Sequence, residues 1–109
     1  MKTQKIMQSP VAKKMYDLKR TTAFAMLNGR CREARTAQKE FAKLAVDNFN
    51  TAINLPKPLE GNIPLFSKWG LNILKCHIFK LFTQKTPEEK QLKQMMDDYR
   101  TEILFGENQ

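Results

Sequence analysis

A row of basic residues at helical spacing is the feature of this sequence with the clearest chemical meaning. On an α-helix its members fall within about 80° of one another, opposite an apolar face. They are Arg32, Arg35, Lys39 and Lys43. Side chains of this kind neutralise nucleic-acid phosphates and release counterions. The row therefore predicts a phosphate-binding face, and the alternative is a solvated basic face that has no partner.

Further basic residues extend this predicted face toward the N-terminus. The candidate nucleic-acid-binding residues are Arg30, Arg32, Arg35, Lys39, Lys43, Lys13, Lys14 and Arg20. Residues 1–55 hold 11 Lys and Arg against 4 Asp and Glu, whereas residues 86–109 hold 3 against 6. A helix-turn-helix motif at Asn28-Gly29 matches weakly, because Arg35 stands where the second helix normally buries an aliphatic residue. A basic helical hairpin laid on phosphates is the broader expectation.

Cysteine and histidine offer little catalytic or metal-binding chemistry in this chain. There are two cysteines and one histidine, and a structural zinc site needs about four such ligands at defined spacing. Cys76 and His77 are adjacent, so on a helix their side chains point about 100° apart and do not form a nucleophile–base pair. Phosphate-binding glycine loops and hydrolase motifs do not occur. We therefore expect no enzyme, no catalytic residue, no metal and no cofactor.

The cysteines and the N-terminus together suggest a compartment. Cys31 and Cys76 allow one bridge, but the N-terminus has no apolar run of the length that a signal peptide needs. We therefore expect reduced thiols and a cytoplasmic location. Lysines interrupt the most apolar stretch, 63–82, and each would cost roughly 2.5–3.5 kcal/mol inside a membrane. No transmembrane segment is expected.

Apolar residues spaced by three and four predict α-helices, and no stretch has the period of two that is typical of a strand. The chain of 109 residues fits a single all-α domain, 1–109. Start signals are Ser9-Pro10 and the capping box of Thr86-Pro87-Glu88-Glu89. The expected elements are a frayed tail at 1–8, helices at about 10–27, 30–54, 65–83 and 87–104, and a loop at 55–64. Asn28-Gly29 either separates the first two helices or lies within one bent helix.

The expected helix at 65–83 is apolar around most of its circumference. A helix of this kind is usually central to a core, so we expect an irregular four-helix bundle around it. Alternatively, its aromatic residues form an exposed patch that binds another protein. The candidate interface residues are Phe66, Trp69, Phe79 and Phe82.

Two functional hypotheses follow. The leading one is a small, basic, non-enzymatic accessory protein that binds nucleic acid through the helices at 10–27 and 30–54. The alternative is an adaptor or inhibitor that docks a helix face on a larger, acidic target protein. A homodimer is also possible, because the alanines of the helix at 30–54 resemble a helix–helix seam in which Asn48 sets the register.

Overall fold

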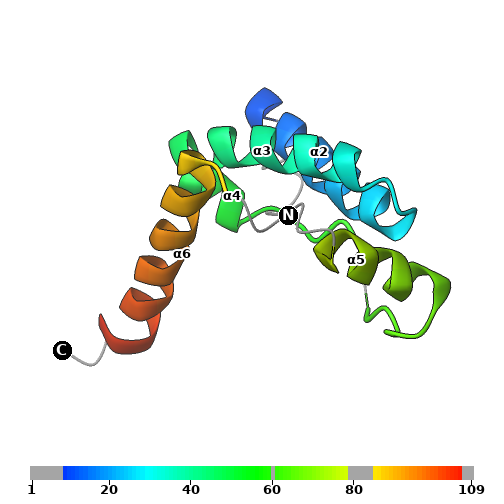
Figure 1. The fold of residues 1–109 in the computed structure, drawn as a ribbon. Helices are drawn as coiled ribbons and strands as arrows, with labels where there is room; N and C mark the ends of the chain where they lie inside the picture. Colours follow the sequence, from blue (N-terminus) through cyan, green and yellow to red (C-terminus); the bar gives the residue numbers. More distant parts are fainter. Residues whose placement is uncertain (1–8, 60, 79–84, 107–109) are drawn as a thin grey trace.

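The computed structural model describes residues 9–59, 61–78 and 85–106, and all regular secondary structure in these ranges is helical. The expectation of an all-α fold is confirmed. In chain order the helices are α2 (Pro10–Leu27), α3 (Cys31–Asp47), α4 (Phe49–Ile53), α5 (Lys68–Ile78) and α6 (Pro87–Phe105). Figure 1 shows α2 and α3 side by side, with α5 and α6 projecting from the same side of this pair at its two ends.

The beginning and end of α2 follow from local sequence. The Ser9 hydroxyl accepts a hydrogen bond from the backbone N–H of Ala12 at 3.5 Å, and Pro10 occupies the first helical position, where no backbone donor is needed. The helix ends at Leu27, Asn28 caps it, and Gly29 follows with a φ of +73°. Glycine adopts this left-handed conformation without steric cost. The chain therefore reverses at 28–30 and sends α3 back along α2.

Small side chains allow the helices around α3 to pack closely. The alanines buried in α2 and α3 are Ala12, Ala25, Ala34, Ala37, Ala42 and Ala45. Within the chain, α3 packs on α2 and on α6. The alanine face that was expected to contact a second copy of the chain therefore packs against other helices of the same chain. Asn48, the expected register residue, instead donates a hydrogen bond from Nδ2 to the Leu44 carbonyl at 3.0 Å.

The same asparagine explains why the expected helix at 30–54 is two helices. Asn48 has φ −133° and ψ 49°, outside the helical range, and it separates α3 from α4. Its side-chain amide bonds the Leu44 carbonyl, which the backbone N–H of Asn48 also bonds. Asparagine competes for backbone groups in this way and so favours helix ends. The chain consequently bends, and α4 ends before Leu55, which joins the core.

The helix that we expected at the centre of the core lies at its edge. Within 65–78 the helical part is α5, and its buried residues are Gly70 and Cys76. Most of its large apolar side chains are exposed instead. The bundle expected around this helix is not found in the described residues; the core cluster is Ala12, Met15, Ala45 and Leu55. Residues 79–83 of the expected helix lie outside the described residues.

A disulfide and a side-chain hydrogen bond join α5 to the hairpin. Cys76 forms a disulfide with Cys31 at the start of α3. Asn72 donates a hydrogen bond from Nδ2 to the Leu27 carbonyl at the end of α2, at 2.8 Å. The expectation that both thiols are reduced is therefore wrong for this structure. Spacing in the sequence did not pair them, because the pairing depends on α5 folding back over the 28–30 turn.

α6 begins at the predicted capping box and then leaves the body of the molecule. The Thr86 hydroxyl accepts from the Glu89 N–H at 3.3 Å, and the Glu89 carboxylate accepts from the Thr86 N–H at 3.0 Å. Glu89 is the buried residue of this helix, and the side chains of its last turn, such as Ile103 and Phe105, are exposed. The molecule is accordingly open, with a radius of gyration of 15.1 Å against about 13 Å for a compact chain of this length.

Candidate functional site

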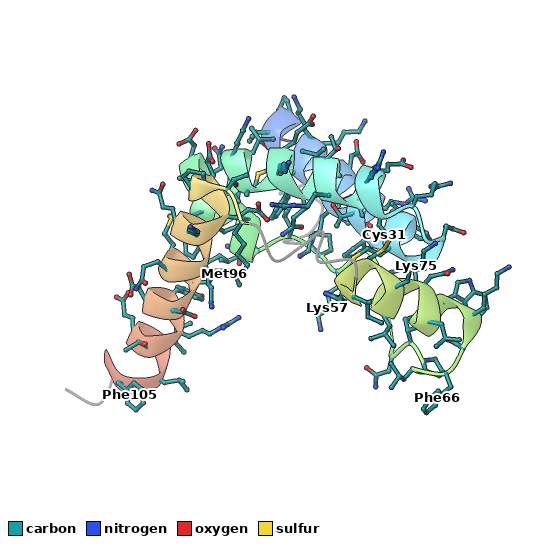
Figure 2. All side chains as sticks on the ribbon, viewed as in Figure 1. Cys31, Lys57, Phe66, Lys75, Met96 and Phe105 are labelled. Carbon is teal, nitrogen blue, oxygen red and sulfur yellow. A yellow bond between two sulfur atoms is a disulfide. The ribbon has the colours of Figure 1, made fainter. Side chains whose placement is uncertain are left out.

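The outer surface of the α2–α3 hairpin carries most of the predicted basic face. Figure 2 shows nitrogen and oxygen atoms intermixed on this side, away from α5 and α6. The exposed members of the predicted set are Lys13, Lys14, Arg20, Arg30, Arg32, Lys39 and Lys43. Arg35, in the middle of the predicted row, is the exception.

Arg35 points inward and is buried against α6. Its Nη1 donates to Glu89 Oε2 at 2.6 Å, and its Nη2 lies 2.6 Å from Glu89 Oε1. Both side chains are more than nine-tenths buried. A guanidinium engaged in this way is unavailable to a phosphate, so its assignment to the nucleic-acid-binding face is wrong. The sequence did not reveal this because Arg35 fits a regular i, i+4 row and its acidic partner lies on another helix.

The Glu89 carboxyl is ionised in this environment. Burial alone would raise the pKa of Glu89, but hydrogen bonds from Arg35 and from the Thr86 backbone lower this pKa below its ordinary value. The negative charge also lies in the first turn of α6, where the helix dipole favours it. The pair therefore joins α3 to the start of α6 through a charge-assisted contact.

The rest of the basic face is interrupted by acidic side chains and by local pairing. Arg30 Nε lies 2.9 Å from Glu33 Oε2, and the Arg20 guanidinium lies over the Phe24 ring at 5.3 Å. The exposed acidic residues on the same hairpin are Asp17, Glu33, Glu40 and Asp47. The face is thus a mixed surface in which Arg32, Lys39 and Lys43 form the clearest basic row.

The structure describes two of the four aromatic residues that were predicted to form a protein interface. Phe66 is 86% exposed and Trp69 is 54% exposed, just before and within the first turn of α5. Phe79 and Phe82 lie outside the described residues. The two observable candidates therefore meet the first requirement of an interface, which is access to solvent.

A groove that was not predicted from the sequence lies between the hairpin and α6. It has a volume of about 630 Å³ and is lined by residues of α2, α3, α4 and α6 together with Pro58. Its main apolar side chains are Met26, Phe41, Ile53, Leu92, Met96 and Tyr99. On one wall the rings of Phe49 and Tyr99 meet edge to face, with centroids 5.9 Å apart. Leu92, Met96 and Tyr99 are spaced by three and four and so share one face of α6, but this spacing does not indicate that the face borders an open groove.

Lys19 brings positive charge to this apolar groove. Burial lowers the pKa of Lys19, and the nearby ammonium of Lys57 lowers it further. Lys19 lines the groove, and no ion pair joins it to a carboxylate among the described residues. In Figure 2 Lys57 points into the space between α5 and α6. The Lys19 ammonium loses hydration through burial and is repelled by the second ammonium. A carboxylate placed beside it would offset both effects.

The described ranges show whether cysteine, histidine and acidic side chains are placed for redox or metal chemistry. Cys76 is bonded to Cys31, so neither sulfur is a free thiol. Histidine, cysteine and carboxylate side chains within these ranges form no group suited to a metal ion. Among the helices of these same ranges, none has both the length and the apolar character needed to cross a membrane.

Comparisons with models of protein families, with curated proteins and with solved structures find no match.

Proposed function

We propose that this protein is a non-enzymatic binding module whose groove between the hairpin and α6 accepts an apolar helix of an acidic partner protein. The observation that carries the proposal is the position of Lys19, a partly buried cation at an open apolar groove, without an ion pair to any described carboxylate. The proposal keeps the acidic protein partner of the adaptor hypothesis but reverses the docking: a helix of the partner enters a groove of this chain, whereas the sequence suggested that a helix face of this chain docks on the target.

The shape and lining of the groove suit a helix better than a polar ligand. Apolar side chains from four helices surround it, and Met26 and Met96 are flexible enough to adjust to an entering side chain. Helix-in-groove recognition inserts apolar residues at i, i+3 or i+4 and i+7 into such a surface. Each buried apolar Å² contributes about 25 cal/mol, so a few anchors support a specific complex.

The positive charge at the groove predicts a negative charge on the partner. A glutamate or aspartate at the edge of the docked helix would face Lys19 and Lys57, and would counteract the burial and the repulsion by Lys57 that lower the Lys19 pKa. Arg100 also lines the groove but already lies 3.7 Å from Asp97. Lys19 and Lys57 are therefore the residues on which specificity for an acidic helix depends.

Binding of two designed peptides tests this proposal. The first is an amphipathic helix with leucines at i, i+3 and i+7 and glutamates beside them; the second has glutamine at each glutamate. Fluorescence anisotropy should show tighter binding of the glutamate peptide, and Lys19→Gln should weaken that binding about fivefold, the value of a partly screened ion pair. Lys14→Gln, on the outer surface, is the matched control. Equal affinity for both peptides, or an unchanged affinity in Lys19→Gln, would refute the proposal.

Nucleic-acid binding is the second candidate, and one observation favours it. Arg32, Lys39 and Lys43 are exposed on one row of α3, and no ion pair joins them to a described carboxylate. Arg35 is not counted because it is buried. Replacement of the other three residues by glutamine should reduce the slope of log affinity against log salt concentration by about three or less, because each duplex phosphate contact contributes about 0.9 to that slope. Absence of binding at low salt would remove this candidate.

The Cys31–Cys76 disulfide is relevant to the cellular compartment in which the protein resides. The cytoplasmic location expected from the sequence stays a prediction, and the Cys31–Cys76 bridge favours an oxidising compartment instead, because cytosolic thiols are kept reduced. Alkylation of the protein in intact cells tests this: a maleimide reagent should leave both sulfurs unmodified if the bridge forms there, and should label them if it does not.

A further inference from the structure

We propose that two copies of this chain associate reciprocally, with α5 of each copy packed on the last turns of α6 of the other. Three observations carry this proposal: an uncovered apolar stripe on α5, an uncovered apolar end on α6, and opposite local charge on the two. None of the residues concerned is needed for the groove proposed above, so the two proposals stand or fall separately.

The outward face of α5 has the pattern of a helix that packs on another helix. Leu71, Leu74 and Ile78 recur at steps of three and four and so share one face. All three are exposed, Ile78 to 66%. The opposite face already holds the disulfide and the Asn72 hydrogen bond to the hairpin. The apolar stripe is therefore the side of α5 that the described residues of its own chain leave exposed.

The end of α6 carries large apolar side chains that the described part of the chain does not cover. Ile103 and Phe105 are exposed to 49% and 62%, although α6 is anchored at its other end by Glu89. Figure 2 shows Phe105 at the far end of α6 and Phe66 at the far end of the α5 region, both well away from the hairpin. Large apolar side chains concentrated at such ends mark an interaction surface.

The opposite charges of α5 and the end of α6 favour contact between these two helices. Residues 65–78 contain two lysines, Lys68 and Lys75, and no acidic residue. Residues 95–106 contain three acidic residues, Asp97, Asp98 and Glu102, against one arginine. Contact between α5 and α6 is therefore attractive, whereas α5 on α5 or α6 on α6 places like charges together. Each chain supplies one helix of each kind, so two copies related by a twofold axis satisfy both contacts and close the assembly.

The exposed surface is large enough for such a dimer. The chain exposes 8115 Å², whereas a folded monomer of 12.7 kDa exposes about 6,200 Å². A standard interface takes roughly 800 Å² from each partner, less than half of this excess. Association of two copies would thus cover surface that folded chains of this size normally bury.

Charge exchange tests the pairing. One full-length variant carries Lys68→Glu and Lys75→Glu, which makes α5 acidic; the other carries Asp98→Lys and Glu102→Lys, which makes the end of α6 basic. We expect sedimentation equilibrium to give twice the chain mass for the wild type and a dissociation constant raised at least about tenfold for each variant alone. An equimolar mixture of the two should recover the dimer, because both of its α5–α6 contacts again join opposite charges. The control is Lys13→Glu with Lys14→Glu, the same charge change on the outer surface of α2, which should dimerise as the wild type does.

Every other outcome overturns the proposal. A wild type that stays monomeric up to about 200 µM excludes association of useful strength. Variants that dimerise like the wild type, or a mixture that stays monomeric, exclude the α5–α6 pairing. A mass that grows beyond the dimer with concentration excludes reciprocal closure. Circular dichroism of each variant shows that the exposed substitutions leave the helices intact.

Discussion

Arg35 and Glu89, which lie 54 residues apart in the sequence, meet through the two Nη nitrogens of the guanidinium and both oxygens of the carboxylate. This buried pair joins the middle of α3 to the first turn of α6. It also removes one cation from the surface that the sequence assigned to nucleic acid. The position of α6, and with it one wall of the groove, depends on this contact.

Breaking the pair should destabilise the fold strongly. Arg35→Ala leaves a buried carboxylate without its counterion, and the expected loss is about 3–5 kcal/mol of unfolding free energy. Arg32→Ala, an exposed change on the same helix, should lie within about 0.5 kcal/mol of the wild type. Chemical denaturation followed by circular dichroism measures both. Equal stabilities of the two variants would show that the ion pair does not hold α6.

Acid should weaken the contribution of Glu89. Its pKa is lowered in the folded chain, so its stabilisation is complete above the unfolded pKa of about 4.3 and is lost as the pH falls through the lower folded value. The difference in unfolding free energy between the wild type and Glu89→Gln should therefore be constant near neutral pH and shrink below about pH 4. Glu40→Gln, an exposed change on α3, should show no such trend. A difference that grows on acidification would contradict the lowered pKa.

Removal of the disulfide should cost stability and release α5. The bridge joins residues separated by 45 positions, for which loop-closure entropy predicts about 4 kcal/mol. The Cys31→Ser/Cys76→Ser variant should lose about this amount, and hydrogen exchange should speed up most in α5, whose described tertiary contacts are few. Dithiothreitol should destabilise the wild type but leave the double-serine variant unchanged. Insensitivity of the wild type to the reductant would show that the bridge contributes nothing to the stability.

Gly70 should tolerate no side chain. A Cβ atom at this position would overlap the backbone carbonyl oxygens of Pro64 and Leu65, which cannot move independently of the loop. Gly70→Ala is therefore expected to shift the start of α5 and to change the emission of the neighbouring Trp69. Gly106→Ala is the matched control, because Gly106 has a helical φ of −66° and a Cβ there meets only the Glu102 side chain at 3.4 Å. Identical spectra of the two variants would argue against the close packing of Gly70.

Short-range signals in the sequence predicted where helices begin, whereas contacts between distant residues determine how the helices pack and which side chains are buried. Ser9-Pro10 and the Thr86 capping box stand at the starts of α2 and α6, because caps act within one turn. The apolar character of 65–78 did not reveal whether its face meets its own chain or solvent, and α5 proved to be peripheral. The burial of Arg35 depends on a carboxylate of a distant helix, which helical periodicity does not report.

The most direct test of the proposed function is a methyl NMR titration of the full chain with the glutamate peptide. Met26, Ile53 and Met96 come from three different helices and line the groove together. Their methyl resonances should shift and saturate in parallel with the anisotropy signal, while the methyl group of Met15, fully buried in the core, should stay in place. Binding of the peptide without shifts of the three groove methyls would contradict the account, because the partner would then dock elsewhere.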